Sequence, residues 1–191
     1  MKVINLGENN SILNKFVAQM RDKSLQKDSM RFRKNLERLG QIFAYEISKT
    51  LKYSEKPVIT PLGIANIGTY DNAIVVATIL RAGLPLHEGI LSYFDDAQNA
   101  FVAAYRKYDK GEDFHINIEY ASTPDLTGKT LILADTMLAT GASLEITYKR
   151  LCEEGEPEHT HLVCPISSAY AVEYLQKNMP ADKVTLWVAA I

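Results

Sequence analysis

The most informative part of the sequence is the segment Leu131-Ile-Leu-Ala-Asp-Thr-Met-Leu-Ala-Thr-Gly-Ala-Ser143. Its apolar beginning has the length and composition of a β-strand that is buried on both faces. Its polar second half leads into Ser143–Glu154, where Leu144, Tyr148 and Leu151 lie on one stripe of a helix. A buried strand, a loop and a helix in this order are typical of an α/β fold with a parallel sheet.

The rest of the chain repeats this alternation. Short, continuous apolar runs predict further buried strands, and segments with helical periodicity separate them. Because parallel strands are joined by right-handed crossovers, we expect a five-stranded parallel sheet with flanking helices. The predicted strands are 73–80, 100–105, 130–134, 161–166 and 184–190, and the predicted helices between them are 84–93, 143–154 and 168–178.

Two amphipathic helices are predicted before the sheet. Apolar residues recur at helical spacing from Ile12 to Met20 and from Phe32 to Leu51. Asp28 or Ser29 is suited to cap the second helix. A passage punctuated by prolines follows, and we expect it to be mostly loop, with a short strand at 58–60.

We expect a single domain over residues 1–191, because this length suits one hydrophobic core. Residues 1–72 would form the N-terminal helices and a hood-like part, and residues 73–191 the parallel-sheet core. A charged turn followed by alternating apolar residues predicts an antiparallel arm at about 105–121.

Composition and charge exclude several classes of protein. The chain has 47% hydrophobic and 23% charged residues and a net charge of −2, without a basic cluster. We therefore expect no nucleic-acid partner and no membrane partner. The N-terminus lacks a signal peptide, and Cys152 and Cys164 are expected to be free thiols, so we predict a soluble, cytoplasmic protein.

The loop after the central strand has the chemistry of a phosphate site. Gly141 and Ala142 let a ligand approach the backbone, and the first amides of the next helix favour an anion. Thr140 and Ser143 add hydroxyl donors. Asp135, at the strand tip, accepts hydrogen bonds when it is ionised, which suits ribose hydroxyls. The order of these groups matches a ribose 5-phosphate.

Simpler explanations stay open on residue chemistry alone. Strand–loop–helix corners containing threonine, glycine and serine are common, and Ser143 could simply cap its helix. His159 and His161 have the spacing of metal ligands on a strand, but no carboxylate or third histidine is grouped with them, so we predict no metal site there.

Several motifs together resemble one known family. Asp135–Ser143 (DTMLATGAS) resembles the loop that binds phosphoribosyl pyrophosphate (PRPP) in uracil phosphoribosyltransferases, which are type I phosphoribosyltransferases. Ile79–Leu84 (ILRAGL) resembles the pyrophosphate-binding strand end of that family, and Tyr105-Arg106 resembles the start of its flexible arm. Met30–Arg33 (MRFR) is similar to an early family segment. The likeness extends from about residue 30 to the last residue.

This resemblance implies an enzyme of pyrimidine salvage that converts uracil and PRPP to UMP and pyrophosphate, with Mg²⁺ carried largely by the diphosphate. Arg81 and Arg106 would contact the pyrophosphate, Asp135 the ribose hydroxyls, and the loop after it the 5-phosphate. No side chain is predicted to act as a nucleophile or as an acid or base. The implied PRPP-binding residues are Arg81, Arg106, Asp135, Thr136, Met137, Leu138, Ala139, Thr140, Gly141, Ala142 and Ser143.

The sequence also departs from the family pattern. Thr136 and Ala142 replace a usual proline and glycine, and Ser167–Tyr170 (SSAY) replaces a usual Ala-Pro-Glu-Gly stretch. A glycine-rich Gly-Asp-Ala segment that recognises uracil in the family does not occur before Ile191, so we expect the uracil-binding residues beyond that position and a chain that lacks a C-terminal portion.

Two alternative functions share this fold: a nucleotide-sensing regulator that binds RNA, and a transferase for another base. The net charge of −2 weighs against RNA binding. Family members are commonly dimers, so we expect a homodimer or higher homo-oligomer. GTP activates some members, and the sequence leaves this regulation open.

Overall fold

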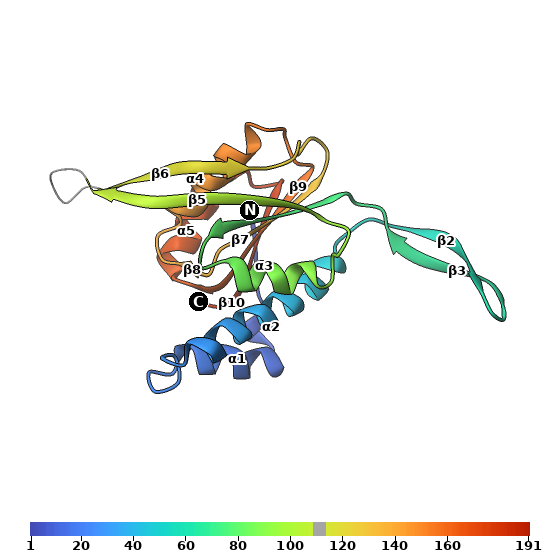
Figure 1. Ribbon diagram of the computed structural model, residues 1–191, viewed down its shortest axis with the longest axis horizontal. Helices are drawn as coiled ribbons and strands as arrows, with labels where there is room; N and C mark the ends of the chain where they lie inside the picture. Colours follow the sequence, from blue (N-terminus) through green and yellow to red (C-terminus); the bar gives the residue numbers. More distant parts are fainter. Residues whose placement is uncertain (109–113) are drawn as a thin grey trace.

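The computed structural model describes the backbone of residues 1–108 and 114–191, and the side chains outside residues 105–118. A single large sheet forms its centre (Figure 1). The strands along its main path are β1 (Lys2–Asn5), β4 (Ile74–Leu80), β5 (Gln98–Tyr108), β6 (Phe114–Ser122), β7 (Thr130–Ala134), β9 (His159–Ser167) and β10 (Val184–Ala190).

The strand order is β1-β10-β9-β7-β4-β5-β6, and only β6 runs antiparallel to its neighbour. The predicted fold class is therefore confirmed, and β4, β5, β7, β9 and β10 are the five predicted parallel strands. Beside the five predicted strands, β1 adds a parallel strand at the edge next to β10. A short strand, β8 (Met137–Leu138), pairs with the end of β9.

Helices cover both faces of the sheet (Figure 1). Alternate residues of each buried strand point to opposite faces, so Val75 packs in one core and Val76 in the other. One face is covered by α1 (Ile12–Arg21), α2 (Ser29–Ser48) and α3 (Leu84–Leu91), and the other by α4 (Ala142–Cys152) and α5 (Ala169–Asn178). A short 3-10 turn, η1 (Leu6–Glu8), links β1 to α1.

Local signals set the ends of these helices. Asp28, one of the two predicted caps, caps α2, because its Oδ1 accepts a hydrogen bond from the Arg31 N–H at 3.0 Å. The helix α4 ends at Cys152, shortly before Gly155, whose φ of 121° lies in the left-handed region. In the part of the chain that the structure describes, no helix is long and apolar enough to cross a membrane.

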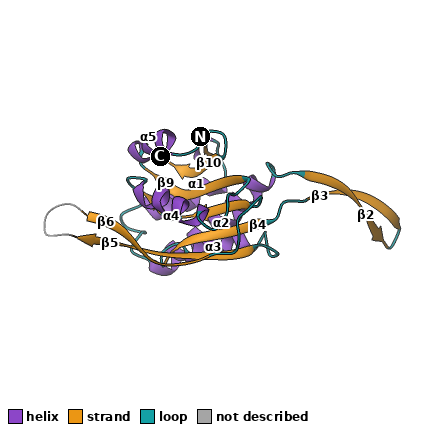
Figure 2. Ribbon diagram, turned by 90° about the horizontal axis from the view of Figure 1, so that it is seen from above, coloured by secondary structure: helices purple, strands orange, loops and turns teal. Residues whose placement is uncertain are grey.

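The passage expected to be mostly loop is instead a β-hairpin of β2 (Tyr53–Thr60) and β3 (Gly63–Tyr70). It projects away from the sheet (Figures 1 and 2). Both of its faces are largely exposed, so no buried face imposes the alternation by which a strand is recognised in a sequence. The predicted antiparallel arm is confirmed, as β6 pairs with β5 from Phe101–Ser122 to Tyr108–Phe114.

Candidate functional site

Two of the predicted motifs leave the sheet at the same edge. In the pairing of β4 with β7, Thr78 lies opposite Ala134, and its Oγ1 donates a hydrogen bond to the Ala134 carbonyl at 3.2 Å. Arg81 follows β4, and Asp135 follows β7 directly. Since neighbouring strands are about 4.8 Å apart, the two motifs begin side by side at the carboxyl ends of the strands.

Asp135 is held at the tip of β7. Its backbone N–H donates to the Val163 carbonyl at 3.0 Å, and its Oδ1 accepts a hydrogen bond from the Thr136 N–H at 2.7 Å. Burial raises the pKa of the Asp135 carboxyl, and the Thr136 N–H partly opposes this rise. The other carboxylate oxygen is left as an acceptor for a hydroxyl group.

The loop after Asp135 ends at an uncapped helix. Gly141 is the N-cap of α4 with a φ of 87°, and no side chain caps the helix. Ser143 therefore does not cap it, which removes the simpler explanation of this serine. The first intrahelical bond runs from the Glu145 N–H to the Gly141 carbonyl at 3.0 Å. The preceding amides have no partner among the described residues and can bind an anion.

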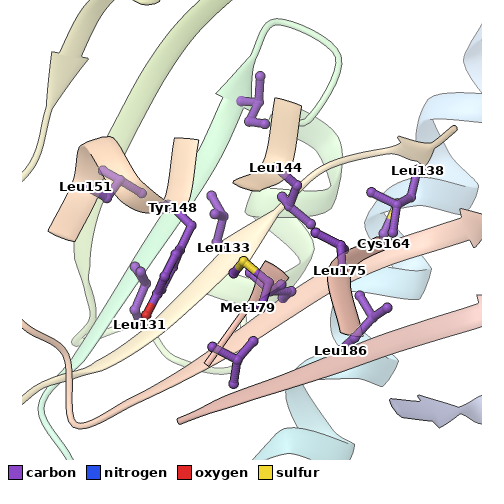
Figure 3. Packing of buried hydrophobic residues seen from close by; sticks show 14 of the residues in the cluster. Leu131, Leu133, Leu138, Leu144, Tyr148, Leu151, Cys164, Leu175, Met179 and Leu186 are labelled. Atoms are coloured by element: carbon purple, nitrogen blue, oxygen red, sulfur yellow. The ribbon is translucent and has the colours of Figure 1, made fainter. Parts of the chain in front are cut away.

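The predicted loop residues differ in whether their side chains are buried or exposed. A small cavity of about 30 Å³ is lined by Asp135, Met137, Leu138, Ala139, Thr140, Gly141, Ser143 and Leu144. The Leu138 side chain itself is buried in the core between the sheet and α4 and α5 (Figure 3). Thr136 is also buried, whereas Met137, Ala139 and Thr140 are exposed. The side chains of Leu138 and Thr136 are thus enclosed by the protein, whereas those of Met137, Ala139 and Thr140 reach the surface.

Arg81 lies beside a second cavity. It is exposed, and the cavity of about 660 Å³ is also lined by Leu80, Ala82, Ala103, Ala104 and Glu119. Arg81 forms no ion pair with a side chain that the structure describes. It is therefore available to an anionic ligand in this cavity.

Arg106 belongs to β5, where its backbone lies opposite Ile116. Its side chain lies outside the described residues, so its predicted contact with pyrophosphate stays a prediction.

A residue without a predicted role contacts the loop. The Ser168 Oγ donates a hydrogen bond to the Ala139 carbonyl at 2.7 Å, and its N–H donates to the Leu138 carbonyl at 2.9 Å. The sequence gives a signal only for its other role, as the cap of α5.

The histidine pair lies at the opposite edge of the sheet. The His161 Nδ1 accepts a hydrogen bond from the Trp187 Nε1–H at 3.0 Å, and the His159 Nε2 is 3.0 Å from the Thr185 Oγ1. The described residues contain no group of three or more His, Cys, Asp or Glu side chains that could hold a metal.

Solved structures share this fold. A purine phosphoribosyltransferase from Pyrococcus horikoshii has a TM-score of 0.53 at 14% sequence identity, covering 82% of this chain and 87% of that one. A protein from Aquifex aeolicus is more similar, with a TM-score of 0.85 and 27% identity over 98% of this chain and 86% of that one. These similarities show that the chain has the fold of the type I phosphoribosyltransferases.

Sequence comparison makes the assignment specific. A family model described as uracil phosphoribosyltransferase matches residues 8–191. The uracil phosphoribosyltransferase of Porphyromonas gingivalis is 51% identical over 191 residues, which is 100% of this chain and 88% of that protein. The chain belongs to the uracil phosphoribosyltransferase family, which confirms the prediction from its motifs.

Proposed function

We propose that this chain transfers the 5-phosphoribosyl group of PRPP to uracil, forming UMP and pyrophosphate in pyrimidine salvage. The observation that carries the proposal is the loop at the carboxyl edge, in which Asp135 is followed by the uncapped beginning of α4. Family membership supports the same reaction. The bond between C1 of the ribose and the diphosphate oxygen breaks, and N1 of uracil bonds to C1 and loses its proton to solvent water.

One end of PRPP would be held by the loop. The amides at the start of α4 and the Thr140 and Ser143 hydroxyls donate to the 5-phosphate, where the helix dipole also favours negative charge. Asp135 accepts from the ribose hydroxyls. These contacts act on atoms that do not react, so their contribution is to fix C1 in place for attack.

The other end of PRPP would lie against the arginines. As the C1–O bond breaks, its electron pair leaves with the diphosphate, and Arg81 stabilises that charge with forked hydrogen bonds from the cavity beside it. Arg106 is proposed to add a second positive charge from β5. No side chain is assigned as a nucleophile or as an acid or base.

Mg²⁺ in proteins is commonly bound by one or two carboxylates together with substrate phosphates. The carboxylates at the two cavities, Asp135 at the loop and Glu119 beside Arg81, are the side chains that we propose for this role. When bound with PRPP, the metal would neutralise charge on the leaving diphosphate. The residues that recognise uracil are not assigned.

The test is UMP formation from labelled uracil and PRPP with Mg²⁺, measured beside cytosine, hypoxanthine and orotate. We expect product from uracil alone. Product from a different base would overturn the base assignment. Failure with all four bases, although PRPP binds, would overturn the proposed activity and favour a regulator.

We also propose a homodimer or higher homo-oligomer that forms through the hairpin of β2 and β3. An exposed β-hairpin with apolar side chains is prone to associate. The exposed apolar residues are Val58, Ile59, Leu62, Ile64 and Ile67. Replacing both Ile59 and Ile64 by Asp should shift the mass in light scattering to that of the monomer; an unchanged mass would exclude the hairpin as the interface.

Two further features remain proposals of smaller scope. GTP is proposed as an activator, and its addition to the UMP assay tests this directly. A cytoplasmic setting is proposed from the cysteines, because Cys152 and Cys164 are free thiols and such thiols persist in a reducing compartment.

A further inference from the structure

The stretch that departs from the family pattern, Ser167–Tyr170, lies beside the phosphate loop. The short strand β8 pairs with the end of β9 through Met137–Ile166 and Leu138–Ser167. This pairing places the middle of the loop next to Ser168, the residue that caps α5.

Three of the hydrogen bonds of Ser168 connect the loop to α5 or cap this helix. Its Oγ accepts from the Ala171 N–H at 3.0 Å and so caps α5. The hydroxyl proton is donated to the Ala139 carbonyl at 2.7 Å, and the backbone N–H is donated to the Leu138 carbonyl at 2.9 Å. One hydroxyl group therefore serves two purposes, since its lone pair caps the helix and its proton fixes the loop.

The same helix contacts the far end of the loop. A Cβ placed on Gly141 would come within 2.9 Å of the Tyr174 Cδ1 and 3.2 Å of the Leu175 Cγ, so α5 packs directly on this glycine. The Tyr174 hydroxyl donates to the Glu145 Oε2 at 2.5 Å, which joins α5 to the first turns of α4. The loop from Leu138 to Gly141 is thus attached to α5 at both ends.

We propose that Ser168 is a positioning residue for the 5-phosphate of PRPP. By holding the Ala139 carbonyl, it fixes the backbone that leads into the amides at the start of α4. The Ser168 hydroxyl also supplies a donor to the Ala139 carbonyl oxygen, which would otherwise be a free acceptor near the negatively charged 5-phosphate. This proposal rests on the proposed function of the loop and assigns a role to one residue of the departing stretch.

Three substitutions separate the two purposes of the hydroxyl. Ser168→Thr keeps a hydroxyl group for both. Ser168→Gly removes the donor but caps a helix almost as well as serine, and Ser168→Ala removes both the donor and the cap. The Gly and Ala variants therefore differ in helix stability but share the loss of the bond to Ala139.

We expect the KM for PRPP to rise about 3- to 10-fold in both the Gly and the Ala variant, the range for losing one neutral hydrogen bond. The Thr variant should stay within about twofold of the parent chain, and the KM for uracil should not change. A PRPP KM that rises in the Ala variant but not in the Gly variant would show that Ser168 only caps α5, and would overturn the proposal.

Hydrogen exchange of the loop amides, measured without ligand, separates this inference from the proposed activity. If the parent chain forms no UMP, the proposed function fails, while faster exchange at residues 137–144 in the Gly variant still supports the attachment. An unchanged exchange rate in the Gly variant overturns the attachment whether or not the chain is active.

Discussion

The parallel strands end at two opposite edges of the sheet, an amino edge where they begin and a carboxyl edge where they finish. The polar groups at these two edges differ in kind. At the amino edge, a cavity of about 380 Å³ is lined by side chains that bond mainly to one another. Trp187 donates to His161 at 3.0 Å, and the Asn72 Nδ2 donates to the Thr130 Oγ1 at 3.0 Å. At the carboxyl edge, a cavity of about 660 Å³ lies beside Arg81, and a small cavity of about 30 Å³ at the loop after Asp135 opens on helix amides without a cap.

The two edges therefore differ in whether their polar groups have partners among the described residues. Polar groups that satisfy one another stabilise the folded chain and leave little to offer a ligand. The amides at the start of α4 and the Arg81 guanidinium have no such partner among the described residues, and we propose that they bind the substrate. Substitutions at the carboxyl edge should therefore affect catalysis, whether or not they also change stability, and substitutions at the amino edge should affect stability alone.

The largest effect is expected for Arg81→Ala. Loss of a charged donor to the leaving diphosphate should lower kcat/KM for PRPP about 100- to 1000-fold. The free energy of unfolding should change by less than about 0.5 kcal/mol, because Arg81 is exposed. Steady-state kinetics and urea unfolding measure the two quantities.

Arg21→Ala, at the exposed end of α1, is the matched control and should leave kcat/KM unchanged. Arg81→Lys keeps the charge but loses the forked geometry, so it should lie between the parent chain and the Ala variant. An unchanged rate for Arg81→Ala would remove this residue from the site.

Asp135→Asn should lower kcat/KM for PRPP about 10- to 100-fold, since hydrogen bonds to a charged group contribute about 1.5–3 kcal/mol. The same change should raise stability at neutral pH. Burial raises the pKa of this carboxyl, so the folded state binds its proton more tightly than the unfolded state. The contribution of the Asp135 carboxyl to the free energy of unfolding is greatest at low pH. It falls as the pH rises from the pKa of the unfolded state to the higher pKa of the folded state, and it stays reduced above that value.

Asparagine has no charge to bury, so the gain in the urea midpoint should be present at pH 7 and absent near pH 3.5. A variant that loses activity and also loses stability at pH 7 would show that Asp135 is structural, and the contrast between the two edges would fail there.

Gly141→Ala should raise the KM for PRPP about 5- to 10-fold and also destabilise the chain by about 1–3 kcal/mol. The residue has a φ of 87°, and an added Cβ would contact Tyr174 at 2.9 Å. Gly128→Ala is a matched control, because Gly128 has a φ of 69° but nothing within 4 Å of an added Cβ. It should lower stability without changing the KM. Equal KM values for the two variants would contradict the role of the loop.

Much of the fold could be predicted because its strands are buried on both faces. A continuous apolar run such as 130–134 can be recognised from the sequence of the strand alone, without knowledge of the strands beside it. All five predicted strands are present. β1 escaped prediction because it has only four residues, too few for a periodic pattern. The hairpin of β2 and β3 escaped because its exposed faces impose no alternation.

The candidate site divides in the same way. The roles predicted for Asp135 and Gly141 follow from local order in the chain, a strand tip followed by a helix start, and the structure places both residues at the same loop. Ser168 lies 29 residues from Ala139 in the sequence, so its bond to the loop depends on the pairing of β8 with β9. Local patterns do not contain such tertiary contacts.

The smallest effect on catalysis is expected at the amino edge, for His161→Gln. Burial lowers the pKa of His161 to about 3, with a smaller contribution from His159, so the folded state excludes a proton that the unfolded state binds. Stability from this group is complete above the unfolded pKa of about 6.5 and is lost as pH falls, by up to about 1.4 kcal/mol per pH unit. Glutamine keeps an acceptor for the Trp187 Nε1–H.

Urea unfolding between pH 5 and 7, followed by the fluorescence of Trp187, the sole tryptophan, should therefore show a shallower pH dependence in His161→Gln. His159→Gln is the companion variant, because burial also lowers the pKa of His159, which is less buried than His161. Both variants should keep the parent KM for PRPP and for uracil. A changed KM would mean that the amino edge binds a substrate or communicates with the loop, and the separation of stability from catalysis between the two edges would then be wrong.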